Sequence, residues 1–429
     1  MKTIIKKGHI LNPSTKMDKV ADILIVDGII EKIEDEINDA DIDQVIMAEG
    51  RYVMPGFIDL HVHFREPGFE YKETIETGSR SAARGGYTSV CPMPNTNPVI
   101  DSKEMIEWLS KKEKEESLVH ILPVGAITKG QNGTDLADIK GMAQAGAKAI
   151  SEDGKSVMDV NVYVEGMKQA KESNLVVLAH CEDKNLVRGG VMNAGKKSQE
   201  LGLKGITNAV EDVITARDIF LANETGAKLH LCHCSTKDSV ALIELAKKAG
   251  YQVSGEVCPH HFTLCDEDIP CDDSNYKMNP PLRSKEDVLA LKNGLKSGIM
   301  DVISTDHAPH GAEEKSKSMV DSPFGIVGLE TAFCLTVTEL VEQGYLTKME
   351  LVEKMSYNPS RIIGIDKGQI VEGKVADLVI ADFEEEYLID VNTFASKGKN
   401  TPFHGKKVKG RIYQTIVAGK VVYDYDKEQ

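Results

Sequence analysis

The chain has 429 residues, of which 41% are hydrophobic and 28% are charged, and its formal net charge is -16. This composition is typical of a globular protein with a large core, and the acidic balance argues against nucleic acid as a partner, because nucleic-acid binding requires a basic surface. No stretch approaches the roughly 18 consecutive apolar residues of a membrane helix, so we expect no membrane partner either.

Both ends of the chain predict short β-strands. Residues 1–54 and 366–429 alternate apolar and polar side chains between Gly and Asn-Pro turn signals. We therefore expect these two segments to build one small β-sandwich domain together.

The middle of the chain, residues 55–365, alternates eight short apolar runs with amphipathic helical patterns such as 208–225 and 236–250. The runs are FIDLHVHF, YTSVCPM, HILPVGAI, AKAISED, LVVLAHC, KLHLCHC, YQVSGEVC and MDVISTDH. Eight βα units predict an α/β fold in which a closed, parallel (β/α)8 barrel of the TIM type carries the chemistry. An open doubly wound sheet is the alternative, but no GxGxxG motif or P-loop supports it.

Nearly every apolar run ends in a residue that can bind metal or substrate. These residues are His61, His63, Asn95, Asp153, His180, His233, His260 and Asp306. In a barrel, the carboxyl ends of all strands meet on one face, where barrel enzymes place their active sites. Imidazoles combined with carboxylates suit Zn²⁺, and a ligand set without Cys is typical of a catalytic rather than a structural zinc site.

Side-chain alternation along the strands indicates which residues share a face. His61 and His63 are two apart on one strand and point to the same side, whereas an isolated histidine at a strand end can equally be a satisfied core residue. If His233 points into the barrel, Cys232, Cys234 and His230 point outward, so the sequence predicts that they lie outside the site.

The eight cysteines form no CxxC pair and no regular framework. Together with the lack of a signal-peptide pattern at the N-terminus, this indicates reduced thiols and a cytoplasmic location.

The motifs of the middle segment occur in a recognisable order. They are PGFIDLHVHFREPG (55–68), PMPNTNP (92–98), SEDG (151–154), AHCED (179–183), HCST (233–236), NPPLR (279–283), STDHAPH (304–310) and PFGIVGLET (323–331), followed by GKVADLVIAD near the end. From end to end the chain resembles the bacterial type I dihydroorotases of the amidohydrolase superfamily. The resemblance implies reversible cyclisation of N-carbamoyl-L-aspartate to dihydroorotate in pyrimidine biosynthesis.

The resemblance also implies roles for individual residues. His61, His63 and Asp306 would bind one zinc ion, His180 and His233 a second, and Asp153 would bridge the two. Many members of the superfamily carry a carboxylated lysine as the bridge. Here Lys148 lies near the start of the fourth strand and Asp153 at its end, which leaves the occupancy of the second zinc site open.

The resemblance places further residues around the substrate. Arg65, Asn95 and Asn279 would hold the α-carboxylate of the substrate and its neighbourhood, and His310 would lie on a mobile loop over the site. The backbone of Pro323, Phe324 and Gly325 would contact the pyrimidine ring. These residue types fit the substrate independently, because an Arg fork pairs with a carboxylate and Asn can both donate to and accept from a ureido group.

The expected chemistry is attack of a zinc-activated water on the ring amide, with Asp306 as general acid and base. The small-molecule substrate is the expected partner; a homodimer and an association with aspartate transcarbamoylase follow from the resemblance alone. Two alternatives stay open: an allantoinase or hydantoinase-type cyclic amidohydrolase, and a non-catalytic scaffold that supports a transcarbamoylase.

Overall fold

The computed structural model describes residues 1–38 and 41–428. The two ends of the chain meet in one sheet, whose strands run in the order β19-β18-β17-β5-β1-β2-β3, with β4 paired to β1. Its strands are β1 (Lys2–Asn12), β2 (Met17–Val26), β3 (Ile29–Glu34), β4 (Gln44–Met47), β5 (Tyr52–Pro55), β17 (Leu378–Leu388), β18 (Lys407–Val417) and β19 (Lys420–Asp424). The antiparallel pairing of β5 with β17 joins the two ends, as expected from their alternating patterns.

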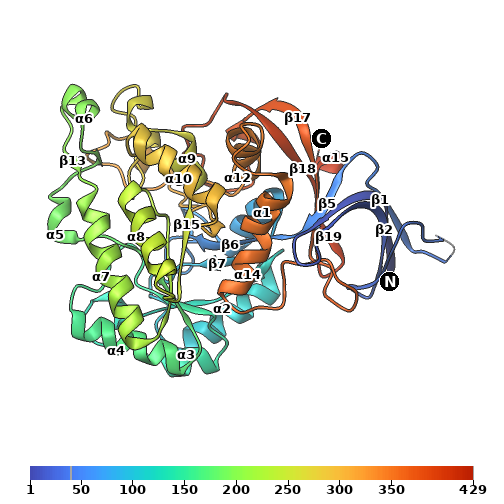
Figure 1. The fold of residues 1–429 in the computed structure, drawn as a ribbon, viewed down its shortest axis with the longest axis horizontal. Helices are drawn as coiled ribbons and strands as arrows, with labels where there is room; N and C mark the ends of the chain where they lie inside the picture. The colour runs from blue at the N-terminus through green and yellow to red at the C-terminus, as the bar shows by residue number, and fades with distance from the viewer. Residues whose placement is uncertain (39–40, 429) are drawn as a thin grey trace.

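This terminal sheet has a core of its own. Buried Ile, Val, Ala and Leu side chains from β1, β2, β3, β5, β17 and β18 pack together in it, with Ile370 and Ala376 contributed by the segment that returns from the middle of the chain. In Figure 1 the sheet lies on the right, beside the larger helical part. The boundaries 1–54 and 366–429 stay a prediction.

Every apolar run of the middle segment contains a strand. The strands are β6 (Phe57–Val62), β7 (Tyr87–Pro92), β8 (His120–Ile121), β9 (Val124–Ala126), β10 (Ala149–Ser151), β11 (Val176–Ala179), β14 (Lys228–Leu231), β15 (Val253–Val257) and β16 (Val302–Ile303), with β8 and β9 in the same run. They pair in parallel and in chain order, as β6-β7-β8 and as β9-β10-β11-β14-β15-β16. A parallel bridge between Val62 and His307 links the first strand to the chain that follows the last.

Helices follow the strands and lie around them (Figure 1). The longer ones are α1 (Ile75–Arg84), α2 (Lys103–Glu116), α4 (Val160–Glu172), α7 (Ala209–Thr225), α8 (Lys237–Lys248) and α10 (Lys285–Ser297). The shorter ones are α3 (Ile139–Gln144), α5 (Lys184–Val187), α6 (Lys196–Leu201), α9 (Pro259–Thr263), α11 (Ala312–Lys315), α12 (Ala332–Thr336), α13 (Lys348–Val352), α14 (Asn358–Ile362) and α15 (Tyr425–Glu428). The helices predicted over 208–225 and 236–250 correspond to α7 and α8. Thr236 begins α8 by accepting a hydrogen bond from the backbone of Ser239, as an N-cap residue does.

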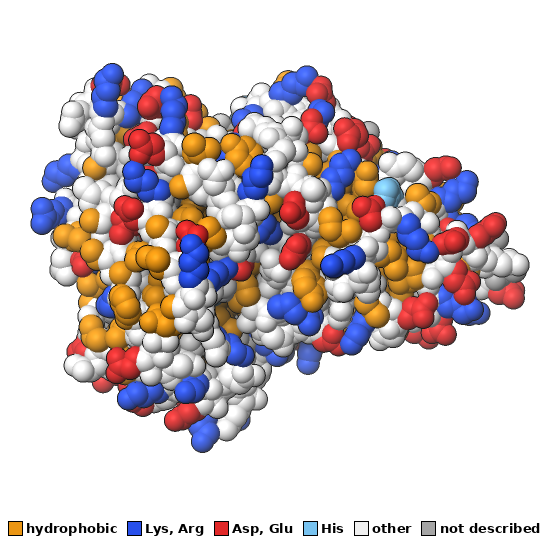
Figure 2. Space-filling view, viewed as in Figure 1, with side chains coloured by type: hydrophobic (Ala, Val, Ile, Leu, Met, Phe, Trp, Pro, Cys, Tyr) orange, Lys and Arg blue, Asp and Glu red, His pale blue; other side chains and the backbone are white. Residues whose placement is uncertain are grey.

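The surface carries interspersed acidic and basic side chains, and hydrophobic side chains gather over α7 and α8 (Figure 2). On these two helices, the side chains of Phe220 and Leu245 are each 64% accessible. Among the described residues, no helix combines the length and the apolar character needed to cross a membrane.

Candidate metal centre and substrate site

The six predicted metal ligands lie together in one buried cluster. His61 is on β6 and His63 just beyond it, while the other four follow the ends of different strands. These four are Asp153 after β10, His180 after β11, His233 after β14 and Asp306 after β16. The parallel strands therefore bring together six residues that are spread between positions 61 and 306 of the sequence, as the strand-end pattern predicts.

Half of the cluster is formed by His61, His63 and Asp306, whose ligand atoms lie within 4.8 Å of one another. The Asp306 carboxylate oxygen Oδ1 lies 3.1 Å from His63 Nε2 and 3.6 Å from His61 Nε2. The other half pairs His180 Nδ1 with His233 Nε2 at 2.9 Å.

Asp153 lies between the two halves. Its Oδ1 atom is 3.2 Å from His61 Nε2, 3.6 Å from His180 Nδ1 and 3.8 Å from His233 Nε2. Its Oδ2 atom is 3.6 Å from His63 Nε2. One carboxylate thus faces all four imidazoles, which is the placement that a bridging ligand requires. Lys148 precedes β10, at the opposite end of the strand from Asp153.

The electrostatics of the cluster fit a cation. Burial acts to raise the pKa of both carboxylates, but the neighbouring histidines outweigh it, holding the pKa of Asp153 well below its ordinary value and that of Asp306 at about 2. Both carboxylates are therefore ionised at neutral pH. Both ring nitrogens of His61 and Nδ1 of His233 are buried without a hydrogen-bond partner among the described residues, so they are available as metal ligands or as donors to a carboxylate.

Two further groups of side chains have ligand atoms within 4.8 Å of one another, and both contain a cysteine. They are Cys258 with His260 and His261, and His61 with Cys232 and Glu256. Burial raises the pKa of both thiols, which keeps them protonated, whereas a thiol binds metal as thiolate. His260, a candidate from its place after β15, lies in α9 with this group and not among the six clustered ligands. The Cys-free cluster is the better metal site.

The predicted orientation of His230 and Cys232 is wrong. Cys232 packs with side chains of the neighbouring parallel strands, such as Leu60 and Leu178, and His230 is fully buried against Glu256. The reason is the backbone at His233, where a φ of 35° turns the chain after the strand has ended and breaks the alternation. Cys234 does pack on the opposite face, as expected.

Asn95 contacts two of the metal-ligand candidates. Its Oδ1 atom lies 3.0 Å from His63 Nδ1, and its Nδ2 donates to Asp153 Oδ2 at 3.0 Å. Asn279 donates through Nδ2 to Glu182 Oε2, and the same oxygen lies 3.5 Å from His180 Nε2. The sequence predicts both asparagines as substrate contacts; the structure places both beside the metal centre. Glu182, inside the AHCED motif, was not predicted as a site residue.

Arg65 and His310, both predicted as substrate contacts, lie next to each other. The Arg65 guanidinium donates through Nε to Pro309 O at 3.2 Å, and its Nη2 atom lies 3.2 Å from His310 Nε2. His310 Nε2 is also 2.8 Å from Phe324 O, and Nδ1 is 3.2 Å from Lys72 Nζ. Burial, then Arg65 and Lys72, lowers the pKa of His310 to about 2, so the ring is neutral and donates from Nε2 to Phe324 while Nδ1 accepts from Lys72.

The buried side chain of Lys315 donates hydrogen bonds to the backbone of the loop formed by Pro323, Phe324 and Gly325. Lys315 Nζ donates to Pro323 O at 3.2 Å and to Gly325 O at 3.0 Å. Burial, and to a lesser degree the charge of Lys277, lowers the pKa of Lys315 to about 7. Gly325 has a φ of 128°, and a Cβ there would lie 2.7 Å from Ala308 Cβ, so this close approach requires glycine.

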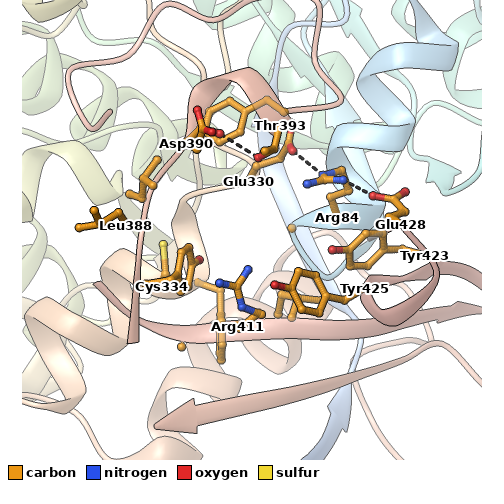
Figure 3. A pocket seen from close by; sticks show the side chains of 17 residues that line it. Arg84, Glu330, Cys334, Leu388, Asp390, Thr393, Arg411, Tyr423, Tyr425 and Glu428 are labelled. Carbon is orange, nitrogen blue, oxygen red and sulfur yellow. Dashed lines mark hydrogen bonds and ion pairs between the residues drawn. The ribbon is translucent and has the colours of Figure 1, made fainter. Parts of the chain in front are cut away.

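A cavity of about 500 Å³ lies elsewhere, between α1, β18 and α15 (Figure 3). Its lining includes Arg84, Glu330, Arg411 and Glu428, and none of the predicted site residues. Arg84 pairs with Glu330 at 2.8 Å and with Glu428, and Arg411 pairs with Glu385. Both guanidinium groups of this lining are therefore already paired with carboxylates.

Comparison with known proteins identifies the relatives of the chain. Residues 50–239 match a family model described as dihydro-orotase-like. Curated relatives named dihydroorotase include one from Acetivibrio thermocellus, 48% identical over 98% of each chain, and one from Geobacillus sp. (strain WCH70), 47% identical over 100% of each. Among solved structures, an L-hydantoinase (dihydropyrimidinase) from Arthrobacter aurescens superposes with a TM-score of 0.89 at 27% identity, covering 98% of this chain and 96% of that one.

Proposed function

The chain belongs to the dihydroorotase family, and from this premise we propose that it is a zinc-dependent enzyme that interconverts N-carbamoyl-L-aspartate and (S)-dihydroorotate. The observation that carries the proposal is the position of Asp153, whose carboxylate faces four imidazole nitrogens at 3.2 to 3.8 Å. We propose further that the bridge between Val62 and His307 closes the parallel strands into a (β/α)8 barrel, beside a β-sandwich built from the terminal sheet.

The residues divide into two sets of zinc ligands. His61, His63 and Asp306 would hold one ion, His180 and His233 the other, with Asp153 shared between them. Imidazole and carboxylate ligands suit Zn²⁺, and bound zinc would polarise the amide carbonyl of the substrate and lower the pKa of a water molecule to about 7.

Asp306 would move the proton. In the hydrolytic direction its carboxylate accepts a proton from the attacking water and delivers it to the leaving ring nitrogen; in the biosynthetic direction it takes the proton from the carbamoyl nitrogen. The low pKa of Asp306 means that the group starts the cycle ionised, as a proton acceptor must.

Arg65 would bind the α-carboxylate of the substrate. Its Nε atom donates to Pro309 O, which helps to fix the plane of the guanidinium, and its terminal nitrogens would reach the carboxylate. Asn95 and Asn279 would contact the substrate from the side of the metal ligands, and the backbone of Pro323, Phe324 and Gly325 would border the ring. His310 would bind as the neutral imidazole.

The test is an assay of the purified, zinc-loaded protein with dihydroorotate, allantoin and hydantoin as separate substrates, followed by metal analysis. We expect turnover of dihydroorotate alone and loss of activity after chelation. Turnover of hydantoin or allantoin in its place would support the alternative cyclic amidohydrolase, and inactivity towards all three would support a scaffold. The homodimer, the association with aspartate transcarbamoylase and the cytoplasmic location stay predictions.

A further inference from the structure

Glu256 is a buried carboxylate directly beneath the candidate metal centre. It lies on β15, and its side chain is fully buried. A carboxylate buried to this extent is costly unless it is paired and hydrogen-bonded. The groups that compensate its charge therefore indicate what it does.

Three groups reach this carboxylate, and two of them belong to predicted zinc ligands. Glu256 Oε1 lies 3.4 Å from His61 Nδ1 and accepts the backbone N–H of His233 at 3.1 Å. His61 belongs to one half of the metal cluster and His233 to the other. One carboxylate thus contacts both halves.

His230 holds Glu256 from the other side. Its Nε2 atom lies 3.0 Å from Glu256 Oε2, and its Nδ1 atom lies 2.8 Å from Ser254 Oγ. Because a carboxylate only accepts hydrogen bonds, it is the Nε2–H of His230 that points at Glu256. This arrangement leaves Oε1 turned towards His61 and His233.

We propose that Glu256 is a positioning residue of the metal centre, accepting the Nδ1–H of His61 so that Nε2 presents its lone pair to the ion. The two atoms lie 3.4 Å apart, slightly longer than a well-formed hydrogen bond, and Nδ1 has no hydrogen-bond partner among the described residues, so a small shift of the ring would let it donate to the carboxylate. A carboxylate on the second nitrogen of a ligand histidine fixes its tautomer and ring orientation and makes it a stronger ligand.

The bond from the His233 amide adds a second function. This hydrogen bond stabilises the backbone turn at His233, where a φ of 35° directs the imidazole into the metal cluster. The thiol of Cys232 also lies within 4.8 Å of Glu256 and His61, but a protonated thiol is a weak acceptor. This inference rests on the proposed zinc site. It extends that proposal by naming Glu256 as a residue that orients the zinc ligands.

The experiment measures zinc affinity of the folded protein by competition with a chromogenic chelator, so it does not depend on turnover. Glu256→Gln keeps the shape but loses the charge, and we expect affinity to fall about 10- to 100-fold. Glu256→Asp keeps the charge but shortens the reach, and affinity should fall by less. Two controls should bind zinc like the wild type: Cys232→Ala at the same imidazole, and Glu330→Gln, which removes a carboxylate bonded to Ser81 and Arg84 instead.

Circular dichroism and urea unfolding separate this role from a purely structural one. If Glu256→Gln or Glu256→Asp is less stable but binds zinc as tightly as the wild type, Glu256 only balances charge in the core and the proposal is wrong. Should Glu256→Gln not fold, Glu256→Asp decides the question. A wild-type protein that binds no zinc would overturn the proposed metal site itself, and the positioning role with it.

Discussion

Lys315 allows a quantitative test of how the loop over the site is held. Lys315→Met keeps the length of the side chain and removes the amine that supports Pro323 and Gly325. Folding lowers the pKa of Lys315 from 10.5 to about 7, so between these values the folded chain binds fewer protons than the unfolded chain. The free energy of unfolding therefore rises with pH in this window, and a variant without the amine does not share the rise.

The magnitude follows from the same linkage. At pH 7 the folded lysine is about half charged and the unfolded lysine fully charged, so the slope grows towards about 1.4 kcal/mol per pH unit and amounts to about 2 kcal/mol between pH 7 and 9. At pH 7 the burial of the partly charged Lys315 amine lowers the free energy of unfolding by about 4 kcal/mol, and Lys315→Met avoids this loss. It leaves Pro323 O without its donor, which costs about 1 to 3 kcal/mol. The carbonyl of Gly325 keeps its bond from Asn400 Nδ2.

We therefore expect Lys315→Met to be more stable than the wild type at pH 7, and its advantage to shrink by about 2 kcal/mol at pH 9. Urea unfolding at both pH values measures this, with Lys196→Met, whose side chain is 92% exposed, as the control. The KM for dihydroorotate should rise because the loop loses a support. Equal pH dependence in the wild type and Lys315→Met would refute the reasoning.

Three further predictions concern the site itself. Asp306→Asn should lower kcat by about 10²- to 10⁴-fold with an unchanged circular dichroism spectrum, and near-normal turnover with zinc bound would exclude Asp306 as the proton acceptor. Arg65→Lys keeps the charge but loses the planar fork, so the KM for carbamoyl aspartate should rise more than kcat falls; an unchanged KM would place Arg65 outside the substrate site. Asp153→Ala should lose the zinc held by His180 and His233 first, as metal analysis would show. The Asp153 side chain is a carboxylate without any modification, whereas a lysine bridge must first react with CO₂. Wild-type apoprotein should therefore regain activity with zinc in bicarbonate-free buffer, and reactivation that requires bicarbonate would contradict the bridging role of Asp153.

The sequence predicts the strands and the eight strand-end candidates because both depend on local pattern, and the family resemblance then selects six of the eight as metal ligands. Each parallel strand of the middle segment is an apolar run, and parallel pairing in chain order brings the carboxyl ends together whatever the intervening loops do. His61, His180 and Asp306 could therefore be placed in one site without knowledge of any distance.

The residues around the ligands could not be predicted in the same way. Strict alternation through His233 predicts the wrong face for His230, because no sequence pattern reveals the positive φ at His233. Glu256 gave no signal of its own, since a single acidic residue in a strand is equally consistent with an exposed position. The resemblance predicts that Asn95 contacts substrate, whereas its contacts with His63 and Asp153 depend on the three-dimensional arrangement of two strand ends far apart in the sequence.

The charge balance of the centre explains why these residues are buried together. Asp153, Asp306 and Glu256 are all buried, and each has a pKa below its ordinary value although burial alone would raise it. The imidazoles supply the compensation: burial opposes the charge of His61, yet Asp153 raises the pKa of that ring well above its ordinary value. A divalent cation among the same atoms would balance the carboxylates equally well and would release the imidazole protons, since histidine binds metal in its neutral form. Three buried carboxylates without such compensation would cost several kcal/mol each, so the imidazoles, or a cation bound among them, are what allows these carboxylates to be buried together.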